Sequence, residues 1–316
     1  MSRAARSRQL LAASGAIYLV WGSAYLAMRV GLRTFPPLLL AGTRLLLAGI
    51  LMGGWAWARG ARIARREWPA VLIAGALLFL GGHGFLYWGQ VRVTSGVAAV
   101  LFATIPLWVV LIEGFSAGGI RLGARAISGL LLGTLGILLL VGPAALLGAG
   151  RVNLPGAAAI LVGALSWSVG SIYCAKARLP RSQALAGGLE MLVGGVLLLA
   201  AAPLLGETRG FSFATVSRAS WLAIGYLVLF SSMIGFSCYL WLLRKASPAR
   251  VSTYAYVTPL VAVVLGWALL REAVTLRTAG AILLLLGAVV LIVRQQSKTG
   301  GPLLAAEAET QGAVVP

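Results

Sequence analysis

The stretch YLVWGSAYLAMRVGL (residues 18–32) returns in altered form as ALSWSVGSIYCAKA (residues 164–177), and this pair decides the fold. Trp21 aligns with Trp167 at an offset of 146 residues. Similar offsets align five more pairs of residues in the same order, namely Arg44 with Glu190, Gly49 with Gly195, Trp88 with Trp241, Pro106 with Pro259 and Gly136 with Gly287. Because self-similarity at a fixed offset indicates a repeated structural unit, we predict that the chain is an internal duplication.

The composition requires a membrane around most of this chain. Of 316 residues, 60% are hydrophobic and the mean hydropathy is +0.95, which is more apolar side chain than a water-soluble domain of this length buries. A helix needs about 20 apolar residues to cross the bilayer core. Ten such windows follow one another, at residues 9–30, 36–57, 69–91, 95–115, 122–142, 155–175, 183–204, 218–241, 250–270 and 275–294. We therefore predict an all-α integral membrane protein with ten transmembrane helices.

The duplication and the helix count together predict an inverted architecture. Five helices per copy is an odd number, so the second copy must enter the membrane from the opposite side. The predicted parts are a cytoplasmic N-terminus at residues 1–8, a first repeat at 9–145, a second repeat at 150–294 and a disordered cytoplasmic tail at 295–316. Two similar halves related in this way favour alternating access to a site near the membrane midplane.

The net charge of +19 reflects orientation and not nucleic-acid binding. The basic residues stand at helix ends instead of in one block or along one helical face, so no nucleic-acid partner is expected. One set of helix ends carries 17 Lys and Arg, and the other set carries eight. By the positive-inside rule, both termini are predicted to lie in the cytoplasm.

Polar and aromatic side chains inside the predicted helices are the candidate substrate contacts, because burying them without a partner is costly. His83 is the single histidine of the chain, and Tyr87 follows one turn later on the same helix face. Either they line a cavity, or His83 bonds to a neighbouring helix; we favour the cavity. Further cavity candidates on other helices are Trp21, Tyr25, Thr104, Trp108, Trp167 and Tyr254. Aromatic residues nearer helix ends fit the interfacial belt instead.

Two prolines and two charged residues occupy symmetric positions in the repeats. Pro106 and Pro259 fall near the middle of the fourth and ninth predicted helices, where a missing N–H tends to kink the helix, so we interpret them as candidate hinges. Arg44 and Glu190 lie at different depths and need not pair. For both charged residues a structural role is favoured over substrate binding.

Several motifs resemble those of the EamA-type members of the drug/metabolite transporter superfamily. Besides the two opening stretches, these are PPLLLAGTRLLLAG (36–49), SGVAAVLFATIPLWVVL (95–111) and its counterpart beginning ARVSTYAYVTPL at residue 249. The resemblance covers residues 10–294 and implies ten helices in two inverted repeats, a bacterial inner-membrane location and, in the branch it is most similar to, amino-acid export. One departure is that REAVTLRTAG (271–280) contains Glu272, whereas the matching GGIRLGARAISG (118–129) contains no acidic residue.

The function predicted from these observations is a secondary transporter that exports small metabolites, amino acids first among them. The alternatives are nucleotide sugars, lipids or drug-like compounds as cargo, and an intramembrane enzyme. The chain has no phosphate-binding GxxxxGK[ST] loop, no HExxH pattern and no aspartate, which disfavours ATP hydrolysis and catalysis. No cofactor and no metal are expected; the expected partners are a small-molecule substrate and the lipid bilayer, and a monomer suffices.

Overall fold

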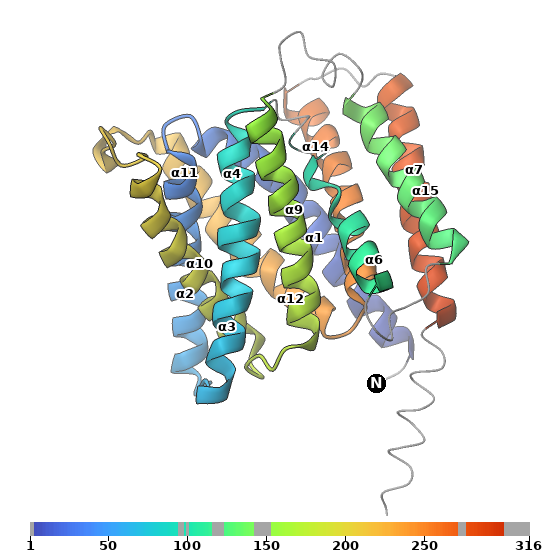
Figure 1. The fold of residues 1–316 in the computed structure, drawn as a ribbon, viewed down its shortest axis with the longest axis horizontal. Coiled ribbons are helices and arrows are strands. Elements are labelled where there is room, and N and C mark those ends of the chain that lie inside the picture. The colour runs from blue at the N-terminus through green and yellow to red at the C-terminus, as the bar shows by residue number, and fades with distance from the viewer. Residues whose placement is uncertain are drawn as a thin grey trace, which may run out of the picture.

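The computed structural model describes residues 3–93, 98, 101–115, 123–141, 153–270 and 276–299, and these residues are helical almost throughout. The first repeat contains α1 (Arg3–Gly31), α2 (Pro37–Ala58), η1 (Arg65–Glu67), α3 (Trp68–Gly75), η2 (Ala76–Gly84), α4 (Phe85–Gln90), α6 (Ile105–Phe115) and α7 (Ala124–Val141). The second contains α9 (Leu154–Lys176), α10 (Gln183–Leu204), η3 (Phe213–Thr215), α11 (Arg218–Tyr226), η4 (Leu227–Gly235), α12 (Phe236–Leu243), α13 (Pro248–Val251), α14 (Tyr254–Leu270) and α15 (Leu276–Thr299). Figure 1 shows them as one layered bundle of steep helices.

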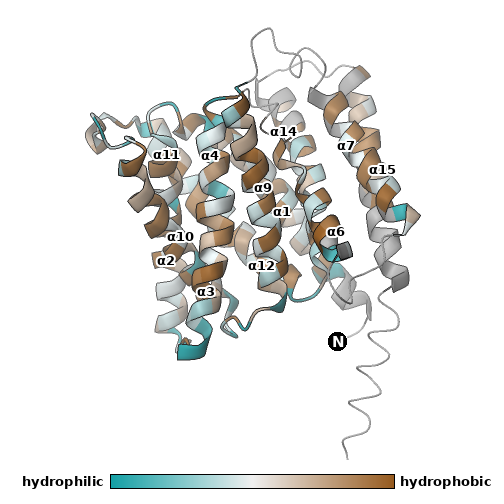
Figure 2. Ribbon diagram, in the orientation of Figure 1, coloured by the Kyte–Doolittle hydropathy of each residue, from teal (hydrophilic) through white to brown (hydrophobic). Residues whose placement is uncertain are grey.

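The ten predicted membrane-spanning helices are confirmed. Six continuous helical stretches of the described chain are long and apolar enough to cross a bilayer, at Arg8–Gly31, Pro37–Ala58, Arg65–Gln90, Leu154–Lys176, Gln183–Leu204 and Arg218–Leu243. The helices α6, α7, α14 and α15 occupy the remaining four predicted positions. Large apolar side chains such as Leu222, at 76% exposure, and Leu283, at 72%, are exposed, and lipid rather than water would cover them. Figure 2 shows hydrophobic residues distributed along the helices of the bundle.

The two repeats contain corresponding elements at the offsets that the sequence indicates. Helix α2 and helix α10 begin and end 146 residues apart, so Arg44 and Glu190 each stand eighth in their helix. Segments η2 and η4 are both nine-residue π-helical stretches, 151 residues apart. A π-helical turn holds an extra residue and is often found near functional sites. Because π-helical segments occur at equivalent places in both halves, they belong to the repeated structural unit.

Helices α2 and α10 cross at very close range through glycines. A Cβ added at Gly49 would lie 2.7 Å from the backbone nitrogen of Leu192, and one added at Gly195 would lie 2.7 Å from that of Leu46. These two contacts are equivalent under the 146-residue offset, as expected for a crossing on the pseudo-twofold axis. Small residues are the usual means by which membrane helices approach this closely.

The first helix of each repeat packs into the other repeat. Helix α1 contacts α11, η4, α12 and α14, whereas α9 contacts η2, α4 and α6. The fifth and tenth spans, α7 and α15, pair with each other at the right-hand edge of Figure 1. The exchange of α1 and α9 brings side chains of both repeats to the centre of the bundle.

The structure differs from the sequence prediction at several helix boundaries. Helix α1 already begins at Arg3, and α15 continues to Thr299, past the predicted start of the tail at residue 295. The junction between the predicted repeats, 146–149, and the tail from residue 300 lie outside the described residues. Pro106 is the second residue of α6 and follows a turn at residues 103–104, so its predicted mid-helix position is wrong; Pro259 does lie inside α14. A proline in a first helical turn removes no helical hydrogen bond.

Candidate functional site

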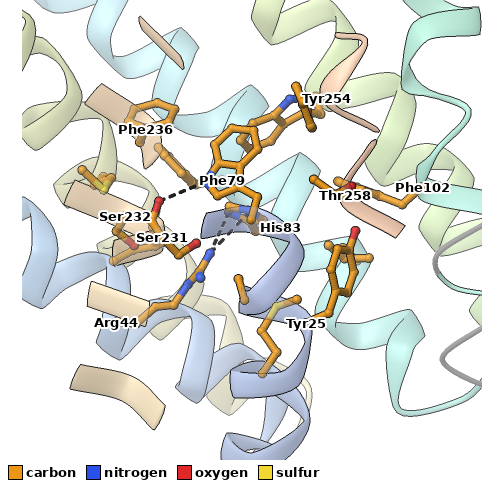
Figure 3. Close-up of a pocket in the computed structure, with 17 residues that line it drawn as sticks. Tyr25, Arg44, Phe79, His83, Phe102, Ser231, Ser232, Phe236, Tyr254 and Thr258 are labelled. Atoms are coloured by element: carbon orange, nitrogen blue, oxygen red, sulfur yellow. Dashed lines mark hydrogen bonds between the residues drawn. The ribbon is translucent and has the colours of Figure 1, made fainter. Parts of the chain in front are cut away.

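A cavity lies among helices of both repeats near the middle of the bundle (Figure 3). It contains about 590 Å³ of space free of protein atoms, counting the part open to its surroundings. Helices α1, α2 and α4 with η2 and Phe102 form the first repeat's share of the wall, and α9, α10, η4, α12 and α14 form the second's. The lining residues are Trp21, Ala24, Tyr25, Met28, Arg44, Leu45, Phe79, His83, Leu86, Phe102, Trp167, Met191, Ser231, Ser232, Phe236, Tyr254 and Thr258.

Aromatic rings from both repeats pack around Trp21 and form one side of this wall. The ring centroid of Trp21 is 4.6 Å from that of Tyr254, 5.3 Å from that of Tyr239 and 5.8 Å from that of Trp167. The indole nitrogen of Trp21 donates a 3.0 Å hydrogen bond to the carbonyl oxygen of Ser231 inside η4. This hydrogen bond to the backbone of η4 therefore fixes the position of the Trp21 ring among the other aromatic rings.

The second repeat makes a matching contact. On α9, the hydroxyl of Ser166 donates a 2.8 Å hydrogen bond to the carbonyl oxygen of Leu77 inside η2. Glycines let the helices come this close, since a Cβ on Gly82 would lie 3.0 Å from the indole ring of Trp167. Each first helix is thus bonded to the π-helical segment of the opposite repeat, which couples the two halves at the cavity.

Among the described residues that line the cavity, Arg44 is the one charged side chain. It is 3% exposed, and one terminal amino nitrogen lies 3.5 Å from Nδ1 and 3.4 Å from Nε2 of His83. A guanidinium can only donate, and a single N–H cannot point along the lone pairs of both ring nitrogens. Behind the pair, the ring centroid of Tyr87 lies 5.4 Å from the guanidinium carbon and 6.1 Å from the imidazole centroid.

The structure brings five of the eight predicted contact residues to one cavity. Trp21, Tyr25, His83, Trp167 and Tyr254 line its wall. Tyr87 is fully buried behind the wall against His83.

The other two predicted contacts, Thr104 and Trp108, are not among the lining residues, and the hydroxyl of Thr104 donates to the carbonyl of Leu101 at 2.6 Å. From the same predicted helix, Phe102 lines the cavity instead. A turn at residues 103–104 changes the course of the chain there, which periodicity from an unbroken helix does not anticipate.

Sequence reasoning missed three polar lining residues: Arg44, which it assigned a structural role, and the adjacent Ser231 and Ser232 of η4. A charge in the interior of a membrane helix is a strong functional signal, so Arg44 could have been found. The serine pair carries a weaker signal because serine is common in membrane helices. Within the described chain, no cluster of three or more His, Cys or Glu side chains could hold a metal ion.

Comparison with known proteins gives consistent matches. The model of the EamA-like transporter family matches residues 9–142 and again residues 154–294. The inner membrane transporter YedA of Escherichia coli (strain K12) is 39% identical over 266 residues, which cover 83% of this chain and 84% of YedA. The transporter YoaV of Bacillus subtilis (strain 168) is 27% identical over 280 residues, covering 86% and 92%. A solved crystal structure shares the fold with a TM-score of 0.77 at 23% identity, covering 93% of this chain and 99% of the other.

Proposed function

Because the chain belongs to the EamA-like transporter family, we propose that it is a secondary carrier that exports small metabolites, with amino acids as its first cargo class. The main support for this proposal is the central cavity. Both repeats enclose it, and its wall combines flat aromatic faces with a few polar groups. Such a wall suits amphipathic molecules, which need apolar contact and a small number of directed hydrogen bonds. Alternating access follows when the two halves rock about the site.

The proposed setting is the bacterial inner membrane, with both termini in the cytoplasm and one chain sufficient for transport. YedA, the relative at 39% identity, is named as an inner membrane transporter, which supports the location. The asymmetry of Lys and Arg between the two sets of helix ends supports the orientation.

Nucleotide sugars, lipids and drug-like compounds are the alternative cargo. A nucleoside diphosphate carries several negative charges, and strong recognition of it calls for several cationic groups. The described wall of this cavity contributes one guanidinium, from Arg44. This favours a cargo with one anionic group over a nucleotide sugar.

Efflux from liposomes tests the proposal. Purified protein is reconstituted with a preloaded panel of labelled amino acids, nucleosides and sugars, each with and without an imposed pH gradient. We expect faster release of amino acids than from protein-free liposomes, and slower release for His83→Ala and Trp167→Ala.

The matched control is Trp57→Ala, since that ring is 50% exposed at the helix end and should not affect release. If folded protein releases no preload of any kind, small-metabolite export is wrong and lipid or nucleotide-sugar cargo takes its place.

A further inference from the structure

We propose that Arg44 binds the carboxylate group of the cargo, so that the cavity selects organic monocarboxylates. The inference rests on the proposed function in one respect only, namely that cargo occupies this cavity.

The guanidinium of Arg44 has donors to spare. Its side chain is 97% buried, since 3% of its surface is exposed, and Nε has no hydrogen-bond partner among the described residues. One terminal nitrogen has a long contact with His83, at 3.4–3.5 Å, and no carboxylate of the described chain forms an ion pair with it. Five N–H donors in a planar fork match the two oxygens of a carboxylate. A buried cation that lacks a protein anion is best explained by an anion that arrives with the cargo.

Two serine side chains share the cavity wall with this guanidinium. Figure 3 shows Arg44 extending from α2 toward His83, with Ser231 and Ser232 on the same side of the cavity. The hydroxyl of Ser232 is buried and has no hydrogen-bond partner among the described residues. A carboxylate held by the fork of Arg44 has lone pairs left over, and a serine hydroxyl can donate to one of them.

The opposite wall is apolar and aromatic. Tyr25, Phe102 and Tyr254 lie across the cavity from Arg44 in Figure 3, and Thr258 is the polar residue beside them. A molecule with one carboxylate and a hydrophobic body therefore meets complementary groups at both ends. This arrangement fits aromatic and branched amino acids, and it also fits simple arylalkyl carboxylates.

The experiment compares ligands with and without the carboxylate, and with and without the amino group. Purified protein in detergent is titrated with phenylalanine, phenylalaninamide and 3-phenylpropionate, and binding is followed by the intrinsic fluorescence of the cavity tryptophans and by thermal stabilisation. The wild type should bind phenylalanine at least about tenfold more tightly than the amide, the lower end of what a charge-assisted pair contributes. Arg44→Gln should abolish this preference, and Arg44→Lys, which keeps the charge and loses the fork, should retain part of it.

The control is Arg59→Gln, because Arg59 lies at a helix end with its guanidinium carbon 4.9 Å from the centroid of Trp55, outside the cavity. It should keep the full preference. The proposal is overturned if the wild type binds the amide as tightly as the acid, or if folded Arg44→Gln still discriminates between them. Should Arg44→Gln not fold, the ligand pairs on the wild type and Arg44→Lys decide.

The same titrations separate this inference from the proposed function. Binding of 3-phenylpropionate that depends on Arg44, with no binding of amino acids, keeps the carboxylate site and removes amino acids as cargo. Binding of phenylalanine and its amide with equal affinity, accompanied by efflux of both, keeps the transporter and removes the role of Arg44.

Discussion

Arg44 and Glu190 are equivalent residues of the two repeats in very different surroundings. Arg44 lines the cavity, whereas Glu190 is completely buried outside its wall, and neither carboxylate oxygen has a hydrogen-bond partner among the described residues. Burying an ionised carboxylate without partners in a membrane interior costs far more free energy than burying a neutral group of the same shape. The pseudo-symmetry of the backbone therefore does not extend to the chemistry of these side chains.

We predict that Glu190→Gln leaves the apparent melting temperature in detergent unchanged or raises it, because the substitution removes the possibility of an unpaired buried charge. A marked drop in the melting temperature would instead reveal a charge partner for this carboxylate.

In contrast to Glu190→Gln, Glu207→Ala should lower the stability of the protein. The carboxylate of Glu207 accepts hydrogen bonds from the backbone N–H groups of Leu38 and Leu39, at 2.8 and 3.1 Å, and so caps the first turn of α2. Loss of this cap should destabilise the protein by about 1 kcal/mol, by analogy with helix caps elsewhere.

At the scale of elements, the crossing of α2 and α10 depends on the absence of side chains. We predict that Gly49→Ala destabilises the protein by about 1–3 kcal/mol, because the new methyl group meets the Leu192 nitrogen at 2.7 Å and the Gly188 carbonyl oxygen at 2.8 Å. Thermal unfolding in a fixed detergent measures the difference.

Gly54→Ala on the same helix is the matched control. Nothing lies within 4 Å of a Cβ at that position, so the change should be neutral or stabilising by up to about 1 kcal/mol through helix propensity. Equal melting temperatures for both variants would mean that the helices can separate without cost.

The two prolines predicted as hinges occupy different positions in their helices. Pro259 is the sixth residue of α14, where it removes the hydrogen bond to the carbonyl of Ala255, whereas Pro106 stands in the first turn of α6. We predict that Pro259→Ala slows efflux and raises the melting temperature, since it completes the helix, and that Pro106→Ala changes the melting temperature little. Efflux rates and thermal unfolding of both variants provide the measurement, and the reverse order of effects would remove the hinge role from Pro259.

At the scale of the whole molecule, the N-terminal end of α1, the connection from α2 to α3 and the connection from α9 to α10 share one end of the bundle in Figure 1. We predict that this is the cytoplasmic end, because it carries the excess of Lys and Arg. A membrane-impermeant maleimide should label Arg209→Cys in intact cells and Arg62→Cys only after permeabilisation. The native Cys174 and Cys238 lie in membrane helices and give the background for both. The opposite labelling pattern would invert the topology.

The sequence was sufficient to predict the number of membrane spans and the duplication. The spans follow from the hydropathy of successive windows, and the duplication follows from matching residues. Both can be read along the chain without knowing which helices pack together. The π-helical segments η2 and η4 could not be predicted, because one extra residue in a helical turn leaves the apolar composition unchanged and depends on the packing partner. The turn at residues 103–104, just before Pro106, could not be predicted either.

Apolar composition and the internal repeat by themselves determined a ten-helix membrane protein built from two inverted halves, because a helix needs a sufficient apolar length to cross the bilayer and an odd number of helices per copy inverts the second copy. Which faces of these helices meet was decided only by the tertiary structure. It moved Trp108 and Thr104 out of the cavity wall and brought Arg44, Ser231 and Ser232 into it. A helix buried on every side is apolar all round, so its periodicity does not distinguish the side that faces a cavity from the side that faces a neighbouring helix.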